Sequence, residues 1–199
     1  MRTFGLITLA LITATVVGMA GCSSASTDFL GDTSKLAADP KFDGALVYRH
    51  PTKTAKDYPK VWLETTQVRF ANPSDANEAD PKATQEFIDF WRSEIERHLV
   101  TGRNFTLVKE AGPGTLRFRL AITGVQPAKA GQLFTATAMP GRLDLGTATL
   151  EAEALDSQNG ERIFALIDQS ATRRPTNANR LEYAKATIKE WTDRLFAAR

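Results

Sequence analysis

The chain has 199 residues, with 25 basic and 23 acidic side chains and a formal net charge of +2. This nearly neutral balance argues against a dedicated nucleic-acid-binding protein, which would carry a strong basic excess. There is one cysteine, which excludes an internal disulfide and a zinc site built from several thiolates.

The first 21 residues are predicted to be a secretory signal. Arg2 precedes an apolar run of about 14 residues, Phe4 to Val17, and small residues follow as far as Gly21. The run is shorter than the ~20 residues that a transmembrane helix needs. A positive start, a short apolar run and a small-residue exit are together typical of a signal peptide.

The segment Gly18 to Cys22 resembles the lipobox of bacterial lipoproteins, with Met19 in place of the usual Leu. The resemblance implies cleavage before Cys22, a diacylglyceryl group on its thiol and acylation of the new amino terminus. In enterobacteria an Asp after the cysteine would retain a lipoprotein in the inner membrane. Ser23 therefore implies sorting to the outer membrane, although this rule differs between bacteria.

Two other assignments leave Cys22 unmodified: an ordinary secreted protein, or a cytosolic protein with an apolar start. A catalytic thiol would need a nearby base, and the Ser-, Ala- and Thr-rich neighbourhood supplies none. We expect residues 1–21 to be a cleaved signal peptide, residues 22–28 a lipidated tether and residues 29–199 a single domain.

The first part of this domain is expected to contain two strands. Phe29, Leu30 and Leu36 should pack an irregular segment onto the domain. The strands are rich in β-branched and aromatic residues, whereas the segment after them has the composition of a loop. The expected elements are strands over 45–50 and 61–70 and a loop over 71–81.

A long amphipathic helix is predicted next. Asp80 is a suitable N-cap and Pro81 a suitable first helical residue. Apolar residues then recur at every fourth position, and Gly102 is the expected C-terminal cap. The predicted buried stripe consists of Phe87, Trp91, Ile95 and Leu99.

Four more strands and a second helix complete the prediction. Apolar residues alternate with charged or small ones over 115–122 and 147–155, as in strands with one buried face. Asn159-Gly160 is a strong hairpin signal, and Asn179 with Glu182 resembles a capping box. The other elements are strands over 105–110 and 161–170 and a C-terminal helix with Ala184, Ile188, Trp191 and Leu195 buried.

These elements predict an α+β fold in the order β-β-α-β-β-β-β-α. Its sheet should be mainly antiparallel, with about five to six strands and two helices packed on it. Arg117 and Arg119 are expected opposite Glu151 and Glu153 on a solvated sheet face. The alternative for these charges is a binding face.

The segment Val125 to Gly146 is longer than the ~12–15 residues beyond which structureless loops become uncommon. It is expected to fold back on the domain, to form a short helix from Ala128 to Ala138, or to expose an apolar lip to a partner protein or the bilayer surface. A second loop, residues 171–180, carries the adjacent Arg173 and Arg174. The candidate contact residues are Leu133, Phe134, Met139, Leu143, Arg173 and Arg174.

No catalytic motif is recognisable in the sequence, and no metal or cofactor is expected. His50 has no recognisable partner, and His98 has only Glu94 at a ligand-like spacing. We interpret His98 as a helix-end histidine, a position that suits the helix dipole. The three tryptophans are interpreted as core residues rather than sugar-binding platforms.

Three motifs resemble a family of uncharacterised bacterial lipoproteins. They are an F-L-G-D opening at Phe29 to Asp32, a G-P-G-x-L-R-x-R-x-A-I-T strand at Gly112 to Thr123, and an E-A-E-x-x-D-S-Q-x-G-E-R hairpin at Glu151 to Arg162. Ala111 stands where that family has a further proline. The element order also resembles small domains of penicillin-binding-protein activators and curli-type secretion lipoproteins, which bind partners.

We therefore expect a non-catalytic lipoprotein, anchored through Cys22 on the periplasmic face of the outer membrane. Its domain is expected to bind an envelope protein or a cell-wall component, without a cofactor and without nucleic acid. The alternative is an envelope hydrolase or carbohydrate-binding enzyme that uses carboxylates. With 23 acidic residues in the chain, carboxylates alone do not select between the two.

Overall fold

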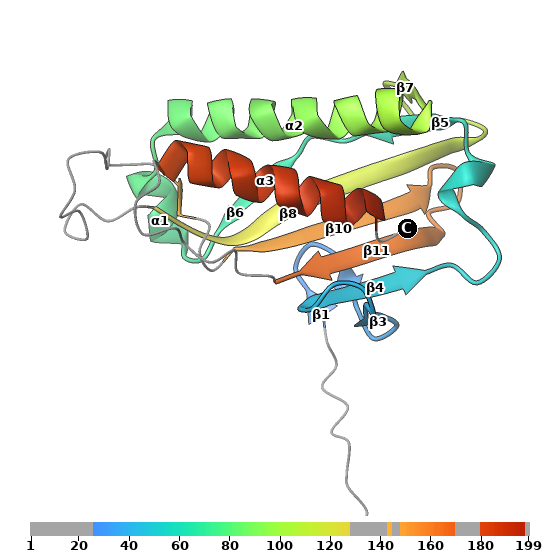
Figure 1. Ribbon diagram of the computed structural model, residues 1–199, viewed down its shortest axis with the longest axis horizontal. Helices are drawn as coiled ribbons and strands as arrows, with labels where there is room; N and C mark the ends of the chain where they lie inside the picture. Colours follow the sequence, from blue (N-terminus) through green and yellow to red (C-terminus); the bar gives the residue numbers. More distant parts are fainter. Residues whose placement is uncertain (1–25, 128–142, 145–147, 170–179, 198–199) are drawn as a thin grey trace, which may run out of the picture.

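A computed structural model of the chain describes residues 26–127, 143–144, 148–169 and 180–197. These residues form a mixed sheet with two long helices on one face and the N-terminal segment on the other (Figure 1). We call the face that carries the helices the inner face and the opposite one the outer face.

The N-terminal segment, residues 26–39, is called the strap below. Its β1 (Ser26–Thr27) pairs with β2 (Gly31–Asp32) in a small antiparallel ribbon. Its β3 (Ala37–Ala38) then joins the edge of the main sheet beside β4 (Ala45–Arg49). The strap therefore starts over the outer face and ends as an edge strand.

Nine strands of the described residues form the main sheet, in the order β3-β4-β11-β10-β8-β5-β7, with β6 and β9 also paired to β8. β8 (Thr115–Pro127) is the longest of them, and the predicted hairpin joins β10 (Thr149–Asp156) to β11 (Arg162–Asp168). The remaining strands are β5 (Lys60–Leu63), β6 (Gln67–Phe70), β7 (Thr106–Val108) and β9 (Leu143–Asp144).

The α+β class is confirmed, but the number and order of the strands differ from the prediction. The single strand expected over 61–70 is two strands, β5 and β6, which pair with successive parts of β8. Both pairings are parallel, as is the pairing of β5 with β7. In the chain, the long helix α2 follows β5 and β6 and precedes β7 and β8. A helical crossover of this kind lets the later strands run in the same direction as the earlier ones.

Helix α2 (Pro81–Arg103) begins where predicted, because the Asp80 carboxylate accepts a hydrogen bond from the Lys82 N–H at 2.9 Å. Its end is different: Asn104, with φ of 58°, is the left-handed C-cap, and Gly102 lies inside the helix. A short helix, α1 (Pro73–Glu78), occupies the segment predicted to be loop. Asn72 and Asp75 cap it reciprocally, a local signal that the Asn- and Asp-rich composition obscured. The other helices are the 3₁₀ turn η1 (Ala55–Asp57) and α3 (Arg180–Ala197).

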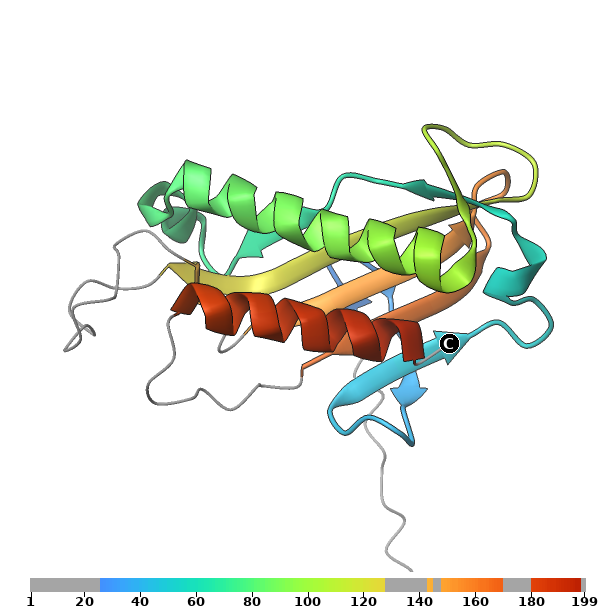
Figure 2. The same ribbon diagram turned by 45° about the horizontal axis from the view of Figure 1, so that its top comes forward.

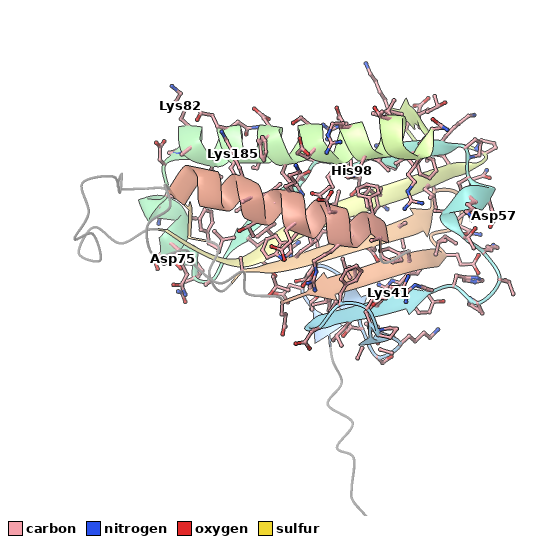
Figure 3. The ribbon with its side chains drawn as sticks, in the orientation of Figure 1. Lys41, Asp57, Asp75, Lys82, His98 and Lys185 are labelled. Carbon is pink, nitrogen blue, oxygen red and sulfur yellow. The ribbon has the colours of Figure 1, made fainter. Side chains whose placement is uncertain are left out.

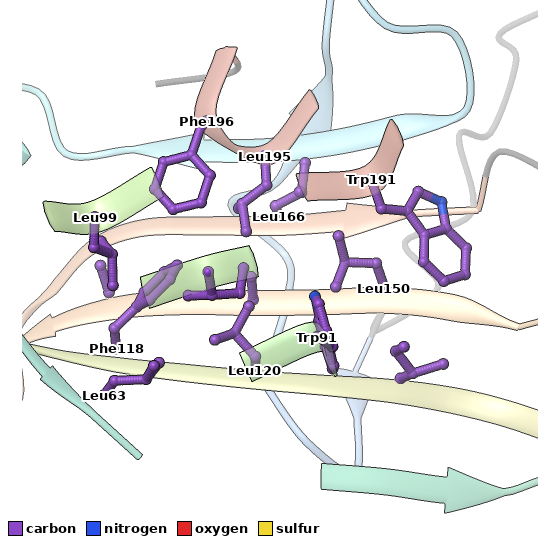
Figure 4. Close-up of a cluster of buried hydrophobic side chains, with 14 of the residues drawn as sticks. Leu63, Trp91, Leu99, Phe118, Leu120, Leu150, Leu166, Trp191, Leu195 and Phe196 are labelled. Carbon is purple, nitrogen blue, oxygen red and sulfur yellow. The ribbon is translucent and has the colours of Figure 1, made fainter. Parts of the chain in front are cut away.

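The hydrophobic core lies between the inner face and the helices α2 and α3, which run side by side across the sheet (Figures 2 and 4). The predicted stripe of α2 is buried, and so are the described members of the α3 stripe. Among the described residues, no helix combines the length and apolar character needed to cross a membrane. The largest buried core side chains include Trp91, Trp191, Ile95, Leu99, Leu120, Ile122, Leu150 and Ile188.

The end of α3 is attached to the sheet by an ion pair. Arg194 donates from Nε and Nη2 to the two carboxylate oxygens of Asp168, at 2.7 and 3.2 Å. The Asp168 side chain is fully buried, and the Arg194 guanidinium also covers the ring of Phe42. This two-bond geometry fixes the helix on β11 in one orientation.

Candidate functional site

The backbone of the strap is held on the outer face by Arg162. Arg162, at the start of β11, donates from Nη2 to the carbonyl oxygen of Leu30 and from Nη1 to that of Asp32, each at 2.6 Å. Its Nε donates to Glu153 on β10 at 3.2 Å. The guanidinium thus clamps the backbone of the strap to the middle of the sheet.

Glu153 binds two arginine side chains at a position that is almost fully shielded from water. Only 2% of its side chain is exposed, and it forms ion pairs with Arg119 and Arg162. Arg119 also lies over the ring of Phe29, with its guanidinium carbon 4.8 Å from the ring centre. The paired charges and the aromatic ring of the strap therefore form one contiguous contact.

A second carboxylate, Glu151, holds the start of the strap. It is buried and accepts hydrogen bonds from the Thr27 hydroxyl at 2.5 Å and the Thr123 hydroxyl at 2.9 Å. The Thr27 hydroxyl also accepts from the Leu30 N–H at 2.9 Å. Because Glu151 lies on β10, the first described residues of the chain are attached near the centre of the outer face.

Apolar contacts complete the attachment. Phe29 and Leu30 are both buried, as predicted, against the outer face. The sheet presents Ala121 and Ala165 there, whose small side chains leave room for the strap. The other members of this cluster are Ile167, Leu36 and Tyr48.

The predicted charge pairing across β8 and β10 is correct for one pair and wrong for the other. Arg119 lies opposite Glu153, but Glu151 lies opposite Ala121. Arg117 lies opposite Leu155 and pairs instead with Glu64. The face is also not solvated where the glutamates lie, because the strap covers it.

The three motifs quoted from the sequence meet at this attachment. Phe29 to Asp32 supply the ring and the two carbonyl oxygens, Arg119 comes from the strand motif, and Glu151, Glu153 and Arg162 come from the hairpin motif. Sequence reasoning found the motifs but assigned their charges to solvent. The packing of Phe29 and Leu30 onto the domain was predicted, but the face of the sheet that they cover was not.

A groove of about 570 Å³ lies between α2 and α3, on the side of the helices away from the sheet. His98 faces it (Figure 3), with Nε2 3.2 Å from an Asp193 oxygen and its ring stacked on Phe196 at 4.9 Å. The groove thus combines the partly buried aromatic ring of Phe90 with charged side chains of both signs. Its lining consists of Phe90, Glu94, Arg97, His98, Lys185, Ala186, Lys189 and Asp193.

A second groove of similar size lies at the sheet edge, where β5 and β7 end and the chain continues into β6. Trp62 lines it half-buried, with the Arg117 guanidinium over its ring at 5.3 Å, so its predicted place in the core is wrong. Trp91 and Trp191 are core residues, as predicted. The lining consists of Trp62, Leu63, Glu64, Thr65, Gln67, Arg92, Val108 and Lys109.

His50 has a partner that the sequence did not reveal. Its Nε2 lies 3.0 Å from Glu161, which also binds the Lys53 ammonium. The hydrogen bond from Lys53, with a further one from His50, holds the pKa of Glu161 below its usual value. Nearby, burial and then a 3.0 Å hydrogen bond to Asp156 raise the pKa of Tyr58 to about 12.

Most of the predicted contact residues lie outside the described residues. Leu143 is in β9, opposite Pro127 of β8. Within the parts of the chain that the structure describes, no cluster of three or more His, Cys, Asp or Glu side chains is placed to hold a metal ion. The predicted site residues outside the described residues are Cys22, Leu133, Phe134, Met139, Arg173 and Arg174.

Residues 25–195 match the family described as "Protein of unknown function (DUF3313)". The chain belongs to this family. The match begins at the strap and includes the strand and hairpin that hold it, so the attachment is part of the family domain.

Solved structures offer distant similarities. A PelC dodecamer from Paraburkholderia phytofirmans shares 9% identity at a TM-score of 0.37, covering 73% of this chain and 92% of that chain. A point variant of the same dodecamer gives 9% and 0.40, covering 73% and 91%. A DUF4136 family protein from Bacteroides thetaiotaomicron gives 10% and 0.41, covering 78% and 98%. No curated protein matches the chain.

Proposed function

We propose that this protein is a lipid-anchored envelope protein whose domain binds a partner and catalyses no reaction. The observation that carries the proposal is the strap. The predicted lipidation site, Cys22, is separated by only a few residues from Thr27, which is bonded to Glu151 in the sheet. A chain that continues directly from an anchor into the middle of a rigid sheet suits a module held at a membrane surface.

The lipid anchor is tested by changing its acceptor atom. In cells fed an alkyne fatty acid, wild-type protein should take up the label and fractionate with membranes. Cys22→Ser should lose both, whereas the matched variant Ser24→Ala should keep both. Retention of label and membrane association by Cys22→Ser would contradict the proposal.

The outer-membrane location rests on Ser23 and has its own test. Ser23→Asp should move the lipoprotein to the inner-membrane fraction of a density gradient in an enterobacterial host. Wild-type protein should remain with the outer membrane. If both proteins band with the inner membrane, the outer-membrane assignment fails while the anchor stands.

The groove between α2 and α3 is the surface that we propose for the partner, an envelope protein or a cell-wall component. It offers an aromatic ring and charges of both signs, which suit a polar chain with occasional apolar groups. A photoactivatable amino acid at Lys189, inside the groove, should yield cross-linked products in intact cells. The same probe at Lys82, outside the groove on α2, is the control, and equal products at both positions would contradict the assignment.

A further inference from the structure

We infer that the outer face of the sheet, covered by the strap, is the surface that faces the membrane, and that the phospholipid headgroup layer is its partner. This inference rests on the proposed lipid anchor at Cys22. The proposed function requires only that the domain is tethered; the attachment of the strap fixes which side of the domain is turned to the bilayer.

The first step is the length of the tether. Four residue spacings separate Cys22 from Ser26, which is the first residue of β1. Fully extended, they span at most about 14 Å. The headgroup layer on one side of a bilayer is about 6 Å thick, so about 8 Å remain between its surface and Ser26.

The second step is the site of attachment. Thr27 is bonded to Glu151 on β10, and Arg162 of the neighbouring β11 holds Leu30 and Asp32. Both strands lie in the middle of the sheet order rather than at an edge. The tether therefore enters near the centre of the outer face, and the domain has little freedom to turn over around it.

The third step is a comparison of sizes. A helix with its side chains is about 10 Å across, more than the remaining length of the tether. The helices α2 and α3 lie on the other side of the sheet from the strap (Figures 1 and 2). They cannot come between the sheet and the bilayer while the strap is bound, so the groove between them faces away from the membrane.

Charge does not supply this orientation. Exposed charged side chains of the strap and the turn after it are of both signs: Asp28, Asp32, Lys35, Lys41 and Asp43. Strong attraction to an anionic bilayer needs a cluster of basic residues. The tether and the Arg162 clamp therefore determine the orientation, and the domain without its lipid should not bind vesicles.

The absence of other cysteines makes a direct test simple, because acylation leaves any introduced cysteine as the one free thiol. Exposed Lys35 reports on the strap side, where it lies beside Tyr48 and Arg162, and exposed Lys82 and Lys189 report on the helix side. Each Lys→Cys variant is purified as the full lipoprotein, labelled with a fluorophore and reconstituted in phosphatidylcholine–phosphatidylglycerol vesicles with a headgroup-attached quencher. Iodide quenching in solution corrects for differences in exposure.

The expected result is stronger lipid quenching at position 35 than at positions 82 and 189. Arg162→Ala should reduce that difference, and so should Thr27→Val, which removes one hydroxyl and provides a second, milder variant. Equal quenching at all three positions, or a difference that both variants leave intact, would overturn the inference. So would strap-side quenching in unlipidated Cys22→Ser protein.

Failure of the proposed anchor is recognised separately. Mass spectrometry of the purified protein shows whether Cys22 carries acyl groups. An unacylated wild-type protein contradicts the proposed function, whereas an acylated protein without the quenching difference contradicts the orientation alone.

Discussion

Arg162 donates a hydrogen bond to the carbonyl oxygen of Leu30 at 2.6 Å, across 132 positions of sequence. Removing it with Arg162→Ala should free the strap, because hydrogen bonds to a charged group contribute about 1.5–3 kcal/mol each. Hydrogen–deuterium exchange should rise in the strap and remain slow in α2. Arg97→Ala, which removes an exposed i,i+3 pair with Glu94, should leave exchange in the strap unchanged. Unaltered exchange in Arg162→Ala would contradict the clamp.

Truncation of Glu153 to alanine is predicted to cause a large loss of folding stability. Glu153→Ala would leave Arg119 and Arg162 without their shared carboxylate, with about a quarter of each side chain exposed. Removing one partner from a buried ion pair costs about 3–5 kcal/mol, and the partial exposure of the arginines favours the lower end. Urea denaturation measures the loss.

Glu94→Ala is the matched control for Glu153→Ala. Its partner Arg97 is half exposed, and such helix pairs contribute about 0.3–0.5 kcal/mol. Equal costs for the two variants would show that the cluster at Glu153 is not energetically special.

The inner layer of the fold could be predicted because periodicity reports burial directly. The stripe from Phe87 to Leu99 and the alternation from Leu116 to Ile122 each mark a buried face whose partner need not be known. The burial of the outer face could not be predicted, because Glu151 and Glu153 alternate with apolar residues as they would in a strand with one solvated face. What buries them is a distant segment, and only long-range contact shows that Thr27 meets Glu151.

The strand topology and the groove lined by Trp62 could not be predicted from the sequence, for a similar reason. A single apolar run over 61–70 does not reveal that it breaks into β5 and β6, or that α2 makes both parallel to β8. Trp62 has the same type and strand context as a core tryptophan, but its side chain falls on the outer side of an edge region. Burial of a large residue at the end of a sheet depends on which strands extend past it.

The core stripe of α2 predicts contrasting effects at two positions of one helix. Ile95 is fully buried, so Ile95→Ala should cost about 3 kcal/mol through lost burial and a cavity. Val100 is 45% exposed, and Val100→Ala should change stability by less than about 0.5 kcal/mol. Denaturant midpoints of the two variants test the contrast, which would fail if their shifts were alike.

The end of α2 predicts changes of opposite sign at neighbouring residues. Asn104 has φ of 58°, so Asn104→Ala should destabilise by about 1 kcal/mol, because a Cβ without a compensating polar group disfavours that conformation. Gly102 lies in the helix with open space around its missing Cβ. Gly102→Ala should therefore stabilise by up to about 1 kcal/mol. Thermal unfolding distinguishes these signs, and a stabilising Asn104→Ala would contradict the assigned cap.

The raised pKa of Tyr58 predicts that its hydroxyl ionises at a higher pH than that of an ordinary tyrosine. Burial, with the hydrogen bond to Asp156, raises its pKa from 10.0 to about 12. Because the folded-state pKa is the higher one, the stability it contributes is complete below pH 10 and is lost as the pH rises toward 12. Tyrosinate absorbance should therefore show a late phase from Tyr58, as long as circular dichroism reports a folded chain.

Tyr58→Phe should remove that late phase and flatten the dependence of stability on pH between 10 and 12. The variant also loses the hydrogen bond to Asp156, which should cost about 1 kcal/mol at neutral pH. Tyr48→Phe is the control, since Tyr48 is half-buried against the strap and the hydrogen bond to Asp156 comes from Tyr58. A late phase that persists in Tyr58→Phe, or that disappears in Tyr48→Phe, would assign the raised pKa to the wrong tyrosine.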